Sequence, residues 1–262
     1  MSELLRTENV SEVFGGLKAV TDFNIHLDRG ELVGLIGPNG AGKTTAFNML
    51  TGVYQPTTGS IPFEGESIVG LKPYQVTQRG IARTFQNIRL FSELTVLENV
   101  KIAFHYHVKY GLLESVFRIG RYFKEEEAIE QEAHRLLKIF HLDDKAYEVA
   151  KNLPYGAQRR LEIARALAAK PKLLLLDEPA AGMNPTETAE LLSCINTIRD
   201  TFHVAILLIE HDMSLVMRVC ERIQVINFGQ TIAAGLPSEI ASNQEVIEAY
   251  LGEEEADDDA ED

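Results

Sequence analysis

The stretch that decides the fold is Gly37-Pro38-Asn39-Gly40-Ala41-Gly42-Lys43-Thr44-Thr45. Its first eight residues fit the pattern G-x-x-x-x-G-K-[ST], which is typical of loops that bind the phosphates of a nucleotide. An apolar strand over residues 31–36 leads into this phosphate loop, and a helical pattern over residues 45–50 leads out of it. The pattern needs this strand–loop–helix context, which argues against a glycine-rich turn with an accidental lysine.

The residue types of the phosphate loop predict its chemistry. Glycines let the backbone curl so that successive N–H groups point inward at phosphate oxygens, and the following helix adds the positive end of its dipole. We expect Lys43 to reach the β- and γ-phosphates and the hydroxyl of Thr44 to ligate magnesium. The sequence therefore predicts a nucleoside triphosphate site that uses all nine residues of the loop.

Length and composition bound the class of protein. The chain has 262 residues, of which 45% are hydrophobic and 24% charged, as in an ordinary globular protein that can bury a substantial core. The net charge is −14, and residues 253–262 contain eight acids and no base, which leaves −6 for residues 1–252. A mildly acidic body argues against general nucleic-acid binding, which usually requires a basic surface.

Cysteine usage and hydropathy indicate the compartment. Cys194 and Cys220 lack any paired spacing and lie in apolar helical contexts, so we expect buried thiols in a reducing compartment. The first residues lack the apolar core of a signal peptide, and no apolar run approaches the roughly 18 residues of a membrane span. The sequence predicts a soluble, cytosolic protein that can still dock on a membrane protein.

The segment before the phosphate loop shows alternating strands over residues 4–10 and 20–27. Between them, Phe14 lies in a glycine-flexed turn about 29 residues before Lys43. An aromatic residue there can stack on a nucleotide base, or it can be a packed residue of the hairpin. Spacing alone favours neither interpretation.

Residues 93–165 have the pattern of one helix after another. Leu112, Val116, Ile119 and Phe123 form a stripe at helical spacing, for which packing against neighbouring helices is favoured over a partner-binding or membrane-surface face. A loop is expected over residues 151–158, leading into a helix that begins at Arg159 and ends before a proline.

Two apolar strands follow, and each ends in charged residues. Residues 173–176 are four leucines before Asp177 and Glu178, and residues 204–209 precede His211. Continuously apolar strands are typical of parallel sheets, which bind ligands at the carboxyl ends of their strands. Asp177 can hold magnesium through water, and Glu178 can accept a proton from an attacking water. A helix cap is the alternative for these carboxylates, and the phosphate loop elsewhere in the chain argues against it.

The order of these motifs resembles the ATP-binding cassette (ABC) ATPase family over residues 4–251. The resemblance implies an α/β fold, with a P-loop (RecA-like) core around a parallel sheet, an antiparallel β-subdomain and an inserted α-helical subdomain. It implies one ABC ATPase domain over residues 1–252, with the helical subdomain at about 92–165. Residues 253–262 would be an acidic, disordered tail, for which a solubilising function is favoured over a regulatory one.

The resemblance also assigns functions by position. Phe14 matches the adenine-stacking aromatic residue, and Gln86 matches the glutamine that senses magnesium and the attacking water. Glu178 matches the catalytic base, and His211 matches the histidine that contacts the γ-phosphate and orients the base. The implied catalytic residues are Glu178, His211 and Gln86, and the implied metal ligands are Thr44, Gln86 and Asp177.

Two departures from the family pattern bear on the rate of ATP hydrolysis. The signature L-S-G-G-Q of the family, which caps the γ-phosphate bound by the opposite subunit, here reads Leu153-Pro154-Tyr155-Gly156-Ala157, followed by Gln158. Pro154 lacks both a hydroxyl and an N–H, so one donor is lost, while the N–H of Gly156 and the start of the next helix stay available to an anion. Asn184 stands where the family usually has aspartate. Both departures bear on the rate of ATP hydrolysis, whose change the sequence does not determine, and neither removes Lys43, Asp177, Glu178 or His211, so the enzyme assignment is unchanged.

Longer runs indicate the subgroup. Residues 83–91, 153–165, 177–185, 207–213 and 246–252 look like the branched-chain amino acid importer ATPases of the LivG type. Urea and amide importers use similar subunits. A soluble ABC ATPase outside transport, or a regulatory subunit that hydrolyses little ATP, is the further alternative.

The resemblance implies partners and a location as well. The expected cofactors are ATP and Mg2+. The expected partners are a second ABC ATPase cassette, in a heterodimer with a homologous subunit, membrane permease subunits and, indirectly, a periplasmic or extracellular solute-binding protein, with no nucleic acid. The protein is expected to be peripheral, at the cytoplasmic face of the cell membrane.

Overall fold

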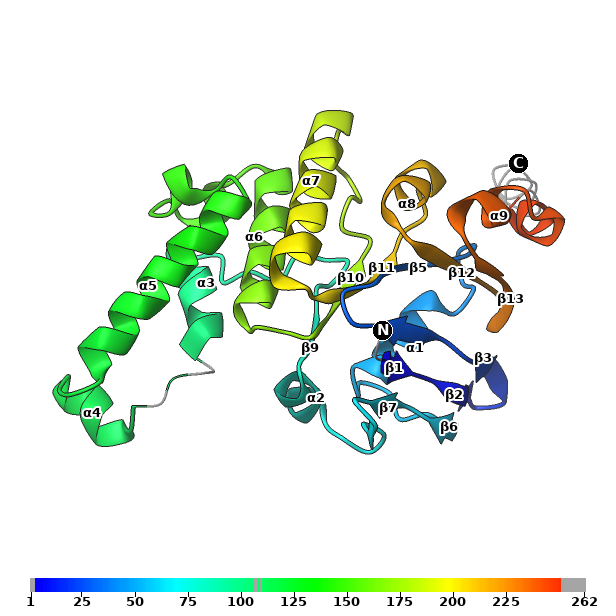
Figure 1. Ribbon diagram of the computed structural model, residues 1–262, viewed down its shortest axis with the longest axis horizontal. Helices are drawn as coiled ribbons and strands as arrows, with labels where there is room; N and C mark the ends of the chain where they lie inside the picture. Colours follow the sequence, from blue (N-terminus) through cyan, green and yellow to red (C-terminus); the bar gives the residue numbers. More distant parts are fainter. Residues whose placement is uncertain (1–2, 106–107, 109, 251–262) are drawn as a thin grey trace. The chain divides into compact units, whose positions relative to one another are not determined.

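The computed structural model describes residues 3–105, 108 and 110–250 (Figure 1). These residues form two compact units. The sheet unit comprises the described residues up to Arg83, Lys172–Pro179 and those from Ile198 onward, and the helical unit comprises Thr84–Pro171 and Ala180–Thr197. The helical unit contains the described residues of the stretch 92–165, while the acidic tail 253–262 lies outside the described residues.

The strands of the sheet unit are β1 (Glu3–Arg6), β2 (Glu8–Phe14), β3 (Leu17–Phe23), β4 (His26–Asp28), β5 (Leu32–Ile36), β6 (Thr58–Ser60), β7 (Pro62–Phe63), β8 (Glu66–Ser67), β9 (Ile81–Arg83), β10 (Leu173–Asp177), β11 (Ala205–Ile209), β12 (Arg222–Asn227) and β13 (Gln230–Gly235). Its helices are α1 (Lys43–Leu50), α2 (Pro73–Arg79), α8 (Met213–Val219) and α9 (Pro237–Ala241). The helical unit contains α3 (Val96–Phe104), α4 (Leu112–Phe117), α5 (Tyr122–Ile139), α6 (Tyr155–Ala168) and the short 3-10 turns Asp143–Lys145 and Ala150–Asn152. α7 (Pro185–Phe202) begins in the helical unit and ends in the sheet unit.

The central sheet has the strand order β13-β12-β5-β11-β10-β9. All neighbouring pairs are parallel except β12 with β13. Since parallel strands end at the same edge, the residues that follow β5, β10 and β11 emerge side by side. The phosphate loop follows β5, Glu178 follows β10, and His211 comes two residues after β11. The sheet therefore places three sequence-predicted elements at one edge.

The two faces of the central sheet are covered by different helices. Val33 and Leu35 of β5 belong to the same buried core as Phe47 of α1. Gly34 points the other way, and a Cβ built on it would lie 2.9 Å from a methyl group of Val216 in α8. Side chains alternate along a strand, so α1 and α8 cover opposite faces of β5. Because helices cover both faces of the sheet, successive residues of the parallel strands are all buried.

The unbroken alternating strand expected over residues 20–27 is wrong, because β3 ends at Phe23 and β4 begins at His26. The side-chain amide of Asn24 donates to the carbonyl of Asp22 at 2.7 Å, and the N–H of Ile25 donates to the hydroxyl of Thr7 at 2.8 Å. These side-chain bonds replace ladder bonds, so the chain passes from the β3-β2-β6 sheet to the β4-β1-β7-β8 sheet.

In the helical unit, α3, α5 and α6 pack against one another (Figure 1). The expected start of α6 at Arg159 is wrong, because the helix begins at Tyr155 with Pro154 in the N-cap position. The N–H of Gln158 donates to the carbonyl of Pro154 at 3.0 Å. Proline has no N–H to lose and its φ of −56° suits a helix entrance, so the first turn forms before the periodic apolar pattern starts.

The apolar stripe of the helical unit does not pack as expected. Val116, Ile119 and Phe123 are 72%, 57% and 63% exposed, and the side chain of Leu112 lies outside the described part of the structure. The favoured interpretation, a face covered by neighbouring helices, is therefore wrong for these three residues. Val116 lies in α4, Ile119 between α4 and α5, and Phe123 in the first turn of α5.

The expectation of buried thiols is confirmed. Cys194 and Cys220 are both buried and free of disulfides. Burial raises the pKa of the Cys194 thiol to about 11 and that of the Cys220 thiol to about 12, so both stay protonated and unreactive at neutral pH. Among the described residues, no helix combines the length and the apolar character that crossing a membrane requires.

Candidate functional site

The phosphate loop wraps around a buried cation. The ammonium of Lys43, whose residue is 7% exposed, donates to the carbonyl oxygens of Gly37 at 2.6 Å and Pro38 at 2.7 Å. These carbonyls hold the side chain back along the loop instead of letting it extend into solvent. The loop thus keeps a positive charge at its centre, directly at the N-terminus of α1.

Glycine is required at two positions of this loop by close backbone contacts. At Gly37, where φ is 153°, a Cβ would lie 1.9 Å from the carbonyl oxygen of Ile226 in β12. At Gly42, where φ is 104°, it would lie 2.8 Å from the carbonyl oxygen of Ala19 in β3. The loop is therefore seated against two strands. Asn39, Gly40 and Thr44 are exposed, Thr45 is half-buried, and Pro38 and Ala41 are buried.

At the end of β10, Asp177 is held by a buried arginine that sequence analysis missed. Nη2 of Arg83 lies 2.6 Å from Oδ2 of Asp177, and both side chains are buried. Nη1 of the same arginine donates to Oδ1 of Asn48 in α1 at 2.6 Å, and the guanidinium lies 5.4 Å from the ring centre of Phe47. Arg83 therefore joins the carboxylate to the helix that follows the phosphate loop. A charged residue in an otherwise apolar strand was the available signal, because such a charge needs a partner.

Glu178 and His211 meet at the neighbouring strand ends. Glu178 adopts a φ of 45°, and its N–H donates to the carbonyl of Ile209 at 2.9 Å. Nδ1 of His211 lies 4.0 Å from Oε2 of Glu178 and 3.8 Å from Oε2 of the buried Glu210. These distances exceed a hydrogen bond, but they bring the imidazole beside two carboxylates while 60% of its side chain is exposed.

The turn after His211 is stabilised by a helix cap. Oδ1 of Asp212 accepts from the N–H of Ser214 at 2.8 Å, from its hydroxyl at 2.7 Å and from the N–H of Leu215 at 3.2 Å. The hydrogen bond from the Ser214 hydroxyl is the largest cause that lowers the pKa of the Asp212 carboxyl. A charged N-cap thus fixes the start of α8 immediately after the histidine.

Phe14, at the end of β2, is 41% exposed. Its ring packs edge-on against Tyr54, with the ring centres 5.1 Å apart and the planes at 72°. One aromatic neighbour therefore orients the ring, and a large part of its surface stays open to solvent. This geometry differs from that of a hairpin residue packed in a core.

In the helical unit, the backbone on each side of Gln86 is fixed by α6. Arg159 is fully buried, and its two terminal nitrogens donate to the carbonyl oxygens of Phe85 and Gln86, each at 2.6 Å. Glu162 pairs with Arg159 at 3.1 Å and also accepts the N–H of Arg89 at 3.1 Å. The side chain of Gln86 is exposed on this fixed backbone. Sequence analysis missed this ion pair, for which the three-residue spacing on a helix was the signal.

The signature stretch divides into buried and exposed residues. Leu153 and Ala157 are buried, whereas Pro154 and Tyr155 are exposed. No side chain caps the first turn of α6, and Gly156 is buried within that turn. The surface that the signature stretch presents is therefore made by Pro154, Tyr155 and the partly exposed Gln158.

Asn184, the second departure, has a structural function at the start of α7. The N–H of Glu187 donates to Oδ1 of Asn184 at 3.0 Å, and the N–H of Asn184 donates to Oε2 of Glu187 at 3.1 Å. This is a reciprocal capping arrangement, and asparagine serves in it as well as aspartate.

The donor chemistry of the sheet unit fits magnesium. Thr44 offers a hydroxyl and Asp177 a carboxylate, which are the oxygen donors that this cation prefers. Across the described ranges, no group of three or more histidine, cysteine, aspartate or glutamate residues forms a metal cluster. Magnesium needs no such cluster, because it keeps waters and takes further ligands from substrate phosphates.

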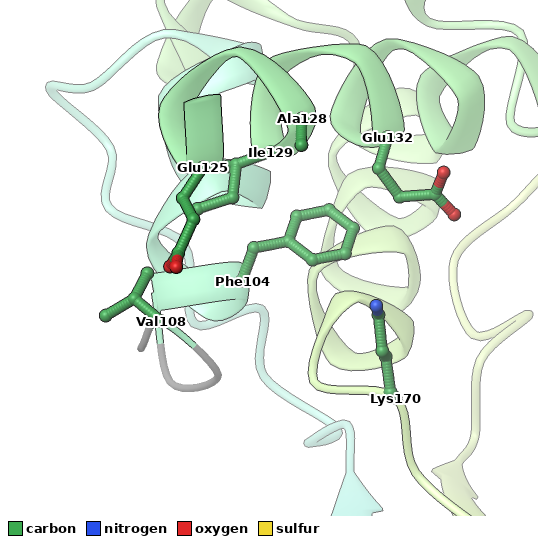
Figure 2. Close-up of a pocket in the computed structure, with 7 residues that line it drawn as sticks. All are labelled: Phe104, Val108, Glu125, Ala128, Ile129, Glu132 and Lys170. Atoms are coloured by element: carbon green, nitrogen blue, oxygen red, sulfur yellow. The ribbon is translucent and has the colours of Figure 1, made fainter. Parts of the chain in front are cut away.

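A cavity of about 330 Å³ lies in the helical unit, apart from these residues. Figure 2 shows Phe104 projecting into it between Ile129 and Lys170. Its lining mixes apolar side chains with two glutamates and one lysine. Charges of both signs favour no one class of ionic ligand, and we assign it no function.

The comparisons with known proteins agree with one another. Residues 20–181 match the family model described as ABC transporter, and residues 230–256 match the model of the branched-chain amino acid ATP-binding cassette transporter. The high-affinity branched-chain amino acid transport ATP-binding proteins BraF of Pseudomonas aeruginosa and LivG of Escherichia coli are each 47% identical, over 95% of this chain and 98% of theirs. A crystal structure of an ABC transporter cassette in its ADP conformation superposes with a TM-score of 0.83 at 32% identity, covering 96% of this chain and all of that one.

Proposed function

The chain belongs to the ABC transporter ATPases, in the branched-chain amino acid group, and on that basis we propose that it powers an importer for branched-chain or other hydrophobic amino acids. As a member of this family it binds and hydrolyses ATP. One observation supports the functions that we propose for individual residues of this chain. The edge of the parallel sheet that holds Lys43 in the phosphate loop also holds Glu178 beside His211.

For binding, we propose that the loop N–H groups and Lys43 surround the β- and γ-phosphates. The buried ammonium supports this proposal, because it is already held inside the loop where those phosphates would lie. Phe14 would stack on the adenine with its exposed surface. Thr44, Asp177 and the side chain of Gln86 would hold Mg2+, which when bound neutralises phosphate charge.

For hydrolysis, Glu178 would accept a proton from the water that attacks the γ-phosphorus. The water oxygen bonds to phosphorus as the bond from phosphorus to the ADP oxygen breaks, so the products are ADP and phosphate. His211 would contact the γ-phosphate and orient Glu178, and its place 4.0 Å from that carboxylate supports this function. The positive φ of Glu178 sets the carboxylate at the strand end, where a strained backbone is typical of functional residues.

For assembly, we propose a sandwich of two cassettes, this chain and a homologous partner, with two ATP molecules between them. The exposed residues Pro154 and Tyr155 would face the ATP bound by the partner. ATP would favour the closed pair because it binds that state better, and hydrolysis would reopen it. Permease subunits would receive the motion at the cytoplasmic face of the membrane, and an extracellular or periplasmic solute-binding protein would deliver the amino acid.

The proposal is tested by replacing the base. Glu178→Gln is expected to bind ATP with about wild-type affinity but to lose at least about 100-fold in turnover, because proton acceptance is removed while the binding contacts stay. Glu221→Gln, at an exposed position in the same unit, is the control and should keep wild-type turnover. Wild-type turnover in Glu178→Gln would exclude Glu178 as the base. Transport of radiolabelled leucine and urea by the reconstituted importer separates the proposed solutes.

A further inference from the structure

The tip of the helical unit, residues 111–124, has apolar side chains on its outside. It consists of α4 and the first turn of α5, and Figure 1 draws α4 at the N-terminal end of α5. Within eight consecutive residues it exposes Val116 at 72%, Phe117 at 66%, Ile119 at 57% and Phe123 at 63%. Single exposed apolar residues are ordinary, but a group of large ones marks an interaction surface.

The single acidic residue of the tip forms hydrogen bonds with the backbone of the tip itself. The carboxylate of Glu114 accepts the N–H of Gly111 at 3.1 Å and the N–H of Arg121 at 3.3 Å, and its backbone carbonyl accepts the N–H of Ile119 at 3.2 Å. The backbone bonds from Gly111 and Arg121 lower the pKa of this carboxyl, so it stays charged at neutral pH. Glu114 therefore closes the turns before and after α4 with local hydrogen bonds to the backbone.

Cations alternate with the exposed apolar residues along the tip. Arg118, Arg121 and Lys124 are all exposed, and within the described residues none of them has a salt-bridge partner. Together with Glu114, they give the tip a net charge of +2 over residues 111–124, in a chain whose net charge is −14. The local positive charge attracts an anionic partner, which the net negative charge of the rest of the chain repels.

We propose that the tip docks on an anionic phospholipid surface. Phe117, Ile119 and Phe123 would enter the boundary between headgroups and acyl chains, while Arg118 and Arg121 would reach lipid phosphates. Interleaved bulky apolar and basic residues are the composition of membrane-surface anchors, in which each cation stays at headgroup level beside an inserted side chain. The inference rests on the proposed function only in that a peripheral transporter subunit works beside a membrane.

Acidic residues next to the tip limit the docked surface. Glu126 is paired within the helical unit, since its carboxylate lies 3.8 Å from the ammonium of Lys101 and accepts the hydroxyl of Tyr110 at 2.9 Å. Glu125 is half-buried, whereas Glu127 is exposed. The lipid contact therefore ends at the first turn of α5, and its strength should fall as salt screens the three cations.

The test is co-sedimentation of the full chain with phosphatidylcholine vesicles, with or without about a quarter phosphatidylglycerol. Binding is expected only to the anionic vesicles, and less at high salt. Arg118→Gln/Arg121→Gln/Lys124→Gln should weaken it roughly 100-fold, because each cation near an anionic surface contributes about fivefold. Phe117→Ser/Phe123→Ser should abolish it. The controls Arg135→Gln/Lys138→Gln/Lys151→Gln and Tyr147→Ser change equally exposed residues of the same unit and should bind as the wild type does.

Three outcomes would overturn the inference. They are no binding to either vesicle, equal binding to neutral and anionic vesicles, and equal effects of the tip and control variants. Tip-dependent binding to the detergent-solubilised permease without vesicle binding would assign the tip to a protein partner instead. ATPase activity in lipid-free solution should be unchanged in every tip variant. A wild type that binds anionic vesicles but hydrolyses no ATP would refute the proposed function and leave this inference standing.

Discussion

At the scale of single residues, the site depends on backbone conformations that few residue types can adopt. The phosphate loop lies so close to β12 that a Cβ at Gly37 would overlap the carbonyl oxygen of Ile226. Gly40 has a positive φ of 73° as well, but a Cβ there would meet nothing within 4 Å. Gly37 is therefore required because a side chain does not fit there, whereas Gly40 is required only for its positive φ.

This difference predicts unequal effects of alanine. Gly40→Ala should cost about 1–2 kcal/mol of the free energy of unfolding, which is the strain of a left-handed alanine. Gly37→Ala adds a backbone collision, so it should cost more than Gly40→Ala and abolish ATP binding. Urea denaturation and nucleotide titration measure the two effects. Equal losses of stability in both variants would contradict the steric explanation.

At the scale of elements, buried charges connect segments that are distant in sequence. Arg159 of α6 joins the carbonyls of Phe85 and Gln86 to the signature stretch of the same unit. In the sheet unit, two ion pairs do the same for strands, since Glu64 after β7 pairs with Arg29 before β5 and with Lys172 before β10. Both connections are made by side chains, so the pattern of helices and strands in the sequence does not predict them.

Removing Arg159 should destabilise the fold strongly. Arg159→Leu leaves Glu162 buried without its cation, for which a loss of about 3–5 kcal/mol in unfolding free energy is expected. The double variant Arg159→Leu/Glu162→Leu should recover part of that loss, because the unpaired charge is gone. Arg135→Leu, which breaks an exposed pair with Glu132, should cost less than about 1 kcal/mol. Urea denaturation measures all three, and no recovery in the double variant would contradict the ion-pair account.

The Glu64 pair predicts a pH dependence. The hydrogen bond from Lys172, followed by that from Arg29, holds the pKa of Glu64 below its ordinary value of 4.5. A lowered folded-state pKa means that the contribution to stability is present above about pH 4.5 and is lost as the pH falls through the lowered pKa. Glu64→Gln should therefore lower the unfolding free energy at pH 7 by up to about 1 kcal/mol, with no difference once the carboxyl is protonated. Urea denaturation at pH 7 and in acid checks this, and an equal effect of the substitution at both pH values would contradict the ion-pair explanation.

At the scale of the whole molecule, the residues of the proposed site are divided between the two units. The phosphate loop, Asp177, Glu178 and His211 belong to the sheet unit, whereas Gln86 and the signature stretch belong to the helical unit. The exposed part of the signature stretch is available to a second cassette. The complete site is therefore proposed to form only in a pair of cassettes.

Nucleotide-dependent pairing is the corresponding prediction. Glu178→Gln mixed with a homologous cassette should form a dimer with ATP and stay monomeric without it, because hydrolysis no longer reopens the closed state. Lys43→Ala in place of Glu178→Gln should abolish pairing. Sedimentation velocity measures both. Dimers of this chain alone with ATP would refute the heterodimer, and pairing independent of nucleotide would refute ATP-driven closure.

The sequence by itself determined the strand–loop–helix of the phosphate loop, the buried strand before Asp177 and the family. These features are local, because backbone conformation and the period of apolar residues are set over a few neighbours. Only the tertiary structure decided that Arg83 pairs with Asp177, 94 positions away, and that Arg159 holds the backbone at Gln86. It also decided that the stripe at Val116 and Phe123 faces outward. A period shows that a face is apolar, but which face is covered depends on where the rest of the chain folds.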